Sequence, residues 1–173
     1  MQLTHRLILT GLPIAAVAAA PAVAQTMDVT LNIPRLKVAE YHAPYVALWL
    51  EKAGQPARTL TILYDYDNRE NGGKKWLTDL RQWWRASGRS LTLPADGVSG
   101  ATRPPGAQKL SFTAGRGTMG TLAPGDYTLL VEAARETGGR EVVRVPFSWP
   151  PKRGQTASAT GQFELGQVSL SFR

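Results

Sequence analysis

Short stretches of alternating apolar and polar residues run through residues 25–173, and they limit the possible fold more than any other feature of the chain. A period of two places apolar side chains on one face of a strand, and turn-forming Gly and Pro residues separate the stretches. Seven stretches are predicted strands: Val29–Ile33, Tyr45–Glu51, Thr59–Tyr64, Lys109–Thr113, Asp126–Ala134, Glu141–Phe147 and Gln167–Phe172. This pattern predicts one all-β domain, an antiparallel immunoglobulin-like β-sandwich, with a loop over Lys152–Gly161.

One segment, Lys74–Ser87, departs from the period of two and is predicted to form an amphipathic helix. Its apolar residues recur at helical spacing: Trp76, Leu77, Leu80, Trp83 and Trp84. Arg81 and Arg85 lie four residues apart on another face, and Gly88 is a plausible stop after the last turn. The densest group of aromatic residues in the chain therefore lies on a helix that precedes the Asp96 loop.

The first 24 residues have the three parts of a cleavable signal peptide. His5 and Arg6 give a basic start, an apolar run extends over Leu7–Ala20, and Ala22-Val23-Ala24 matches a small-x-small cleavage site. The run is short for a membrane span, so a retained anchor is the weaker alternative. We expect cleavage after Ala24 and an extracytoplasmic, periplasmic location for a single domain formed by residues 25–173.

The chain has no cysteine, which excludes a thiol nucleophile, an iron–sulfur cluster, a c-type haem attachment and a zinc–cysteine site. His42 is the only histidine after the leader, so a two-histidine metal site is excluded there as well. The polar run that contains Asp65, Asp67, Asn68 and Glu70 lacks the glycine that an EF-hand needs where Glu70 stands. We interpret this run as a polar loop and predict no metal site.

The formal net charge is +7 and the sequence pI is about 10.1. Nucleic acid is a poor explanation for this charge in an exported protein. A solvated surface, attraction to anionic lipid headgroups and docking on an acidic partner remain open as explanations.

The stretch with the strongest chemical signal is Asp96-Gly97-Val98-Ser99-Gly100-Ala101-Thr102, which has the form Asp-x-x-Ser-Gly-Ala-Thr. Asp-Gly and Ser-Gly are common in turns, so an ordinary polar turn is one interpretation. The small residues around Thr102 would also let its hydroxyl enter the active site of another enzyme. Pro104 and Pro105 would restrict the chain just after that hydroxyl.

This stretch resembles the motif at which bacterial flavin transferases attach FMN to a threonine, as in flavin-bearing subunits of sodium-pumping and Rnf-type oxidoreductases. The resemblance implies that Thr102 is the acceptor, linked to FMN by a phosphoester, with FAD as the donor and AMP released. Asp96, Ser99, Gly100 and Ala101 are the other motif positions. The base and magnesium ion would belong to the transferase.

A wider resemblance covers nearly all of residues 25–173. The helix Asp79–Arg85, the stretch Ser99–Gly106, and Gly125–Leu129 with Glu132–Glu136 are similar to a family of predicted periplasmic proteins called domain of unknown function 2271 (DUF2271). The family tends to accompany a flavin transferase and PepSY-type membrane redox proteins. The resemblance thus implies an electron-transfer flavoprotein with both as partners, and it does not imply a stand-alone enzyme.

Two groups near the loop are further candidates for flavin contacts. Trp84 could present a flat ring to the isoalloxazine, although core packing is the usual role of such a residue. Arg103 adjoins the acceptor and could neutralise the FMN phosphate. Arg81, Arg85 and Arg89 could do the same, or could form a solvated helix face.

Two other functions remain open. A non-redox binding or assembly module is the main alternative, because a β-fold does not fix a function. A hydrolase that uses Ser99 or His42 ranks last.

Overall fold

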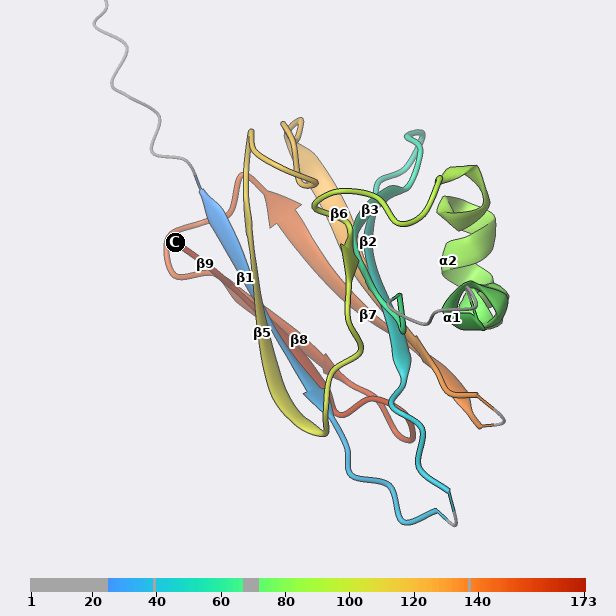
Figure 1. Cartoon of the computed structure of the whole chain (residues 1–173). Coiled ribbons are helices and arrows are strands. Elements are labelled where there is room, and N and C mark those ends of the chain that lie inside the picture. Colours follow the sequence, from blue (N-terminus) through green and yellow to red (C-terminus); the bar gives the residue numbers. More distant parts are fainter. Residues whose placement is uncertain (1–24, 39, 67–71, 137) are drawn as a thin grey trace, which may run out of the picture.

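The computed structural model describes residues 25–38, 40–66, 72–136 and 138–173, which form two facing β-sheets with a layer of short helices outside one of them (Figure 1). The predicted signal peptide lies outside the described residues, as do Asp67, Asn68 and Glu70. Within the described ranges, no helix is long and apolar enough to cross a membrane. Within the same ranges, no group of three or more His, Cys, Asp or Glu side chains could hold a metal ion.

The two sheets contain four and five strands. The four-stranded sheet has the order β5 (Gly106–Thr113), β1 (Thr26–Ile33), β9 (Gln167–Phe172), β8 (Thr156–Thr160). The five-stranded sheet has the order β4 (Ser99–Gly100), β3 (Arg58–Leu63), β2 (Tyr45–Glu51), β6 (Gly125–Ala134), β7 (Arg140–Trp149). All neighbouring strands are antiparallel except β3 and β4, which are parallel.

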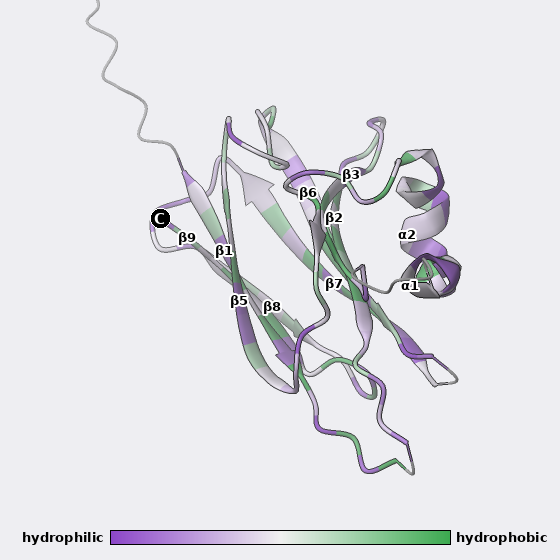
Figure 2. Ribbon diagram, in the orientation of Figure 1, coloured by the Kyte–Doolittle hydropathy of each residue, from purple (hydrophilic) through white to green (hydrophobic). Residues whose placement is uncertain are grey.

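Alternation along the strands divides the buried side chains into two clusters. In β2, Val46, Leu48 and Leu50 face the other sheet, whereas Ala47 and Trp49 face the helices. Because both faces of β2 are covered, its residues Tyr45 to Leu50 are all buried. Strands β1 and β5 have an outer face without a helical cover, and hydrophilic residues interrupt the hydrophobic ones along them (Figure 2).

The helical layer is broken where the sequence predicted one helix over Lys74–Ser87. It consists of α1 (Gly72–Lys75), η1 (Trp76–Asp79), α2 (Arg81–Ala86) and η2 (Gly88–Ser90). Leu80, with φ −75° and ψ 65°, leaves the helical conformation between η1 and α2. The buried carboxylate of Glu132 on β6 accepts the N–H groups of Gln82 (3.0 and 3.1 Å) and Trp83 (2.8 Å). Because the helix begins again after the break, the first N–H groups of α2 have no acceptor within the helix, and Glu132 provides one.

The prediction of an all-β fold is confirmed, and all seven predicted strands are present, with shifts of one to three residues at half of their ends. The prediction of a loop over Lys152–Gly161 is wrong, because Thr156–Thr160 forms β8. Its Ala157 and Ala159 pack against the core between the sheets. Alanine is a weak strand former, so the alternation of small residues there gave no clear strand signal.

Candidate functional site

The Asp96–Thr102 loop runs from the helical layer to the edge of the five-stranded sheet. Its central residues, Ser99 and Gly100, form β4 at the edge of the five-stranded sheet. After β4 the chain crosses to β5, which is the edge of the four-stranded sheet (Figure 1). Thr102 therefore lies in the segment that joins the two sheets at their edge.

Ser99 closes a tight turn at the start of this loop. The Ala95 carbonyl accepts the N–H groups of Val98 (3.1 Å) and Ser99 (2.9 Å), while the Ala95 N–H donates to Ser99 Oγ at 3.0 Å. Gly97 has a φ of +71°, which an L side chain rarely adopts. The turn interpretation of the sequence is thus confirmed for these positions, and it accounts for the Gly and the Ser.

Backbone pairing fixes the next part of the loop to β3. The Val98 carbonyl accepts Ile62 N–H at 2.9 Å and Thr61 Oγ1–H at 2.9 Å, and the Gly100 carbonyl accepts Tyr64 N–H at 2.9 Å. Gly100 does not have a positive φ, so its backbone conformation does not itself require glycine. A Cβ at Gly100 would lie 3.0 Å from Leu63 Cδ2, so a larger residue here would require the Leu63 side chain to shift by a few tenths of an ångström.

The acceptor segment beyond Gly100 is much less tied to the fold. Ala101 and Arg103 are exposed, and Thr102 is half-buried. The Pro104 carbonyl is held by Gln108 Nε2 at 2.9 Å. Within the part of the chain that the structure describes, the side chains of Thr102 and the exposed Asp96 make no hydrogen bond or ion pair. The chain is therefore held on both sides of Thr102, and the Thr102 hydroxyl is left available.

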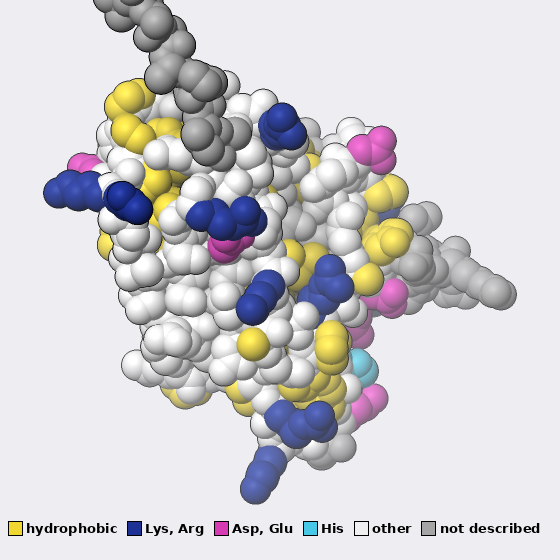
Figure 3. All heavy atoms as spheres, turned by 90° about the vertical axis from the view of Figure 1, so that its left-hand side faces the viewer, with side chains coloured by type: hydrophobic (Ala, Val, Ile, Leu, Met, Phe, Trp, Pro, Cys, Tyr) yellow, Lys and Arg dark blue, Asp and Glu magenta, His cyan; other side chains and the backbone are white. Residues whose placement is uncertain are grey.

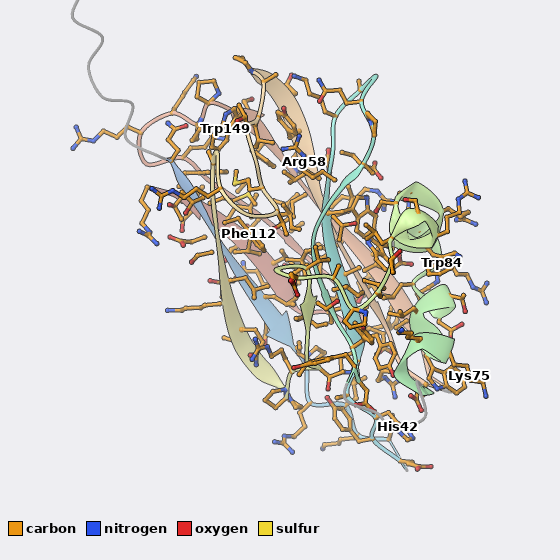
Figure 4. All side chains as sticks on the ribbon, turned by 45° about the horizontal axis from the view of Figure 1, so that its top comes forward. His42, Arg58, Lys75, Trp84, Phe112 and Trp149 are labelled. Atoms are coloured by element: carbon orange, nitrogen blue, oxygen red, sulfur yellow. The ribbon has the colours of Figure 1, made fainter. Side chains whose placement is uncertain are left out.

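The tryptophans of the helical layer differ in burial. Trp83 is fully buried, and its Nε1–H donates to Thr59 Oγ1 at 2.9 Å. Trp84 is half-buried, with its ring centroid 6.1 Å from that of Trp83. Trp84 and Val98 pack against the same core cluster, so the helix and the start of the loop share one apolar environment. Trp84 lies on the helical side of the five-stranded sheet, whereas Phe112 of β5 packs against the core between the two sheets (Figure 4).

The arginines predicted to surround the loop lie in two places. Arg81 and Arg85 on α2, and Arg89 on η2, are exposed in the helical layer. Arg103 alone is next to Thr102 in the acceptor segment. The helix arginines therefore belong to different elements from the arginine that adjoins the candidate acceptor.

Sequence reasoning missed a chain of tyrosines beside the loop. Tyr64, whose N–H pairs with Gly100, contacts Tyr45 and Tyr66 edge-on, with ring centroids 6.3 and 6.1 Å away. Tyr66 is 45% exposed, whereas Tyr45 and Tyr64 are buried. Burial, with the carboxylates of Glu136 and Asp65, raises the pKa of Tyr45 to about 12. These tyrosines lie beside the loop because β3 pairs with β4, and a strand of only two residues has no sequence pattern from which that pairing could be predicted.

The residues of the hydrolase alternative are engaged elsewhere. Ser99 Oγ accepts the Ala95 N–H, and His42 Nε2 lies 3.2 Å from Glu40 Oε1. Among the described residues, no hydrogen bond joins His42 to Ser99.

Comparisons with known proteins support one assignment. No curated protein and no solved structure matches the chain. The model of a family described as predicted periplasmic protein (DUF2271) matches residues 26–167, which covers every described strand except β9, of which only the first residue is included. The family's description agrees with the expected extracytoplasmic location. The chain therefore belongs to the DUF2271 family of predicted periplasmic proteins.

Proposed function

We propose that this protein carries one FMN, attached covalently to Thr102, and transfers electrons outside the cytoplasm. The observation that carries the proposal is a division within the motif. Gly97, Ser99 and Gly100 are explained by the turn and by the packing on β3. Asp96 and Thr102 have no such explanation, because their side chains are unbonded among the described residues. Asp96 and Thr102 are expected to lack a structural role if another protein, the flavin transferase, recognises them.

The environment of Thr102 suits modification by a second enzyme. The Thr102 oxygen would attack the phosphorus of the FMN half of FAD, the pyrophosphate P–O bond would break, and AMP would leave. The hydroxyl proton would pass to a base of the transferase. Exposed Ala101 offers little steric hindrance, and the exposed guanidinium of Arg103 could pair with the phosphate of the product.

A tethered flavin would supply reversible redox chemistry, and the chain's role would be to hold and orient it. The phosphoester would keep the cofactor from diffusing away. A periplasmic flavin transferase and a PepSY-type membrane redox protein are the partners that we propose. We also propose that the two facing sheets are of the immunoglobulin-like class.

A non-redox binding or assembly module is the second candidate. Gly97 and Ser99 form an ordinary turn, which this alternative explains without any modification of the loop. Strands β5, β7 and β8 stand at sheet edges, where another chain could add a strand.

Coexpression with a flavin transferase, followed by intact-mass measurement, tests the proposal. The wild-type protein should gain the mass of one FMN less one water, and Thr102→Ala should gain none because the oxygen is gone. Thr102→Ser should label partly, since it keeps the hydroxyl but loses the methyl group that limits its rotamers. Thr92→Ala, which removes an exposed hydroxyl from the connection that precedes β4, is the matched control and should label fully. An unlabelled wild type, alongside a transferase active on another substrate, would contradict the flavin function.

A further inference from the structure

The helical layer presents an unusual density of positive charge. The segment 72–90 has five exposed cations: Lys74, Lys75, Arg81, Arg85 and Arg89. Its one acidic residue, Asp79, is half-buried. We call these five cations, with the half-buried Trp76 and Trp84, the basic helical surface. Among the described residues, none of the five cations pairs with a carboxylate.

Charges elsewhere on the molecule are arranged differently. Arg135 and Arg140 pair with the buried carboxylates of Glu164 (2.6 Å) and Glu132 (3.0 Å). Arg173 pairs with Asp28 at 2.7 Å. On the side of the molecule formed by the four-stranded sheet, Lys and Arg side chains are spread over the surface, with acidic side chains beside some of them (Figure 3). Ten other Lys and Arg side chains of the described residues also lack a carboxylate partner, but they are distributed over the rest of the fold, so unpaired cations are densest in the segment 72–90.

We propose that the basic helical surface docks this protein on a bilayer that contains anionic phospholipids. Exposed Lys and Arg side chains are attracted to anionic headgroups, and their attraction falls within a Debye length. The inference does not depend on the flavin.

The tryptophans favour a lipid surface over an acidic protein. Trp76 and Trp84 lie within the same short segment as the cations, and Lys75 Nζ lies 5.1 Å from the centre of the Trp76 ring. Tryptophan concentrates at membrane interfaces, where an indole can lie at headgroup level, and long cationic side chains can reach from there toward phosphates. Both indoles pack partly against the core under the helices, and their exposed parts lie beside the charges, where they could meet the membrane interface.

A depression beside this surface could receive a headgroup. It has a volume of about 260 Å³ and is lined by Trp76, Asp79, Arg81, Arg140 and the glycines of the β6–β7 hairpin, Gly138 and Gly139. Arg140 is held by Glu132, whereas Arg81 has no partner among the described residues. The Arg81 guanidinium could therefore pair with a lipid phosphate without giving up an internal partner.

The surface is also held firmly to the sheet. Glu132 caps α2 through the N–H groups of Gln82 and Trp83, and the Trp83 side chain is buried on β3. The cations would therefore reach a membrane as a preformed group, without folding on contact.

Co-sedimentation of the purified protein with vesicles tests this proposal. Vesicles that mix phosphatidylglycerol with phosphatidylcholine should bind the protein, and vesicles of phosphatidylcholine alone should not. Added salt should release it. The triple variant Arg81→Gln, Arg85→Gln, Arg89→Gln should bind at least about tenfold more weakly, because each cation contributes separately. All three positions are exposed, and thermal unfolding would verify that the variant is folded.

A matched triple variant separates this surface from net charge alone. Lys109→Gln, Arg116→Gln, Arg153→Gln removes the same charge from exposed positions outside the helical layer, and its binding should stay within about twofold of wild type. Equal losses in both variants would overturn the proposal in favour of a net-charge effect. Binding to polyglutamate but not to anionic vesicles would overturn it in favour of an acidic protein partner.

Discussion

The Asp96–Thr102 loop combines a hydroxyl without hydrogen bonds among the described residues, that of Thr102, with residues that hold the backbone in place. Ser99 closes the turn, Gly97 supplies the positive φ, and Gly100 lets the backbone approach Leu63. These residues place Thr102 at the joint between the two sheets. A substitution at Gly100 would therefore act on the position of Thr102 through β3, although it would leave the Thr102 hydroxyl itself intact.

The aromatic environment of the loop leads to a prediction about fluorescence. If FMN is attached at Thr102, its fluorescence should be quenched in the folded protein and should recover on unfolding, because a nearby aromatic ring can contact the isoalloxazine. Trp84→Leu should weaken the quenching, since Trp84 shares the cluster that contains Val98. Steady-state fluorescence of the labelled protein measures this.

Tyr66→Leu is the informative comparison for that prediction. Tyr66 is exposed, and it packs on Tyr64, whose backbone pairs with the loop. If Tyr66→Leu restores fluorescence and Trp84→Leu does not, the flavin rests on the tyrosine side. Trp84 would then be a packing residue only.

At the scale of elements, the sequence predicts strands well and their partners poorly. The period of two located Tyr45–Glu51 and Gln167–Phe172 with the bounds that the structure has. The alternation could not locate β4, because a strand of two residues is too short to show a period and is defined only by its pairing with β3. Nor could it place the break at Leu80, which depends on Glu132, 50 residues after Gln82. Of the site, the motif residues were predictable, whereas the neighbouring tyrosines required the pairing of strands.

Glu141 on β7 shows how one side chain holds a connection between elements. Its carboxylate accepts four backbone N–H groups, from Gln162 (2.6 Å), Phe163 (3.0 Å), Glu164 (2.9 Å) and Leu165 (2.9 Å), in the β8–β9 connection. Burial raises the pKa of Glu141, but these donors lower it by more, so the pKa lies below its ordinary value of 4.5.

This lowered pKa predicts a dependence of stability on pH. A carboxylate with a depressed pKa in the folded state stabilises the protein above its unfolded pKa, and that stabilisation is lost as the pH falls through the folded value. Glu141→Gln should lower the free energy of unfolding by about 1–3 kcal/mol at neutral pH, since it removes charge-assisted hydrogen bonds. The difference from wild type should shrink below the ordinary pKa of 4.5. Urea unfolding at several pH values measures it, and a difference that grew on acidification would contradict this role.

At the scale of the whole molecule, backbone hydrogen bonds join the start of the first strand, β1, to the end of the last strand, β9. Thr26 N–H donates to the Arg173 carbonyl at 2.7 Å, and Arg173 N–H donates back to the Thr26 carbonyl at 3.1 Å. The Gln25 carbonyl accepts the Ala114 N–H at 2.9 Å. Residues from Gln25 onward are thus bonded into the four-stranded sheet, so a cut after Thr26 would remove contacts that align β1 with β5 and β9.

These contacts sharpen the prediction of where the leader is removed. Cleavage after Ala24, at the Ala22-Val23-Ala24 site, would leave Gln25 as the first residue and β1 complete. Intact mass and N-terminal sequencing of exported protein should therefore give a chain that begins at Gln25. Ala22→Asp with Ala24→Asp should block cleavage, because the site requires small uncharged residues, and the uncleaved form should accumulate. A mature chain that keeps Leu7–Ala20 would show instead that the apolar run is a retained anchor. A mature chain that begins beyond Thr26 would contradict the role of Gln25 and Thr26 in closing the sheet.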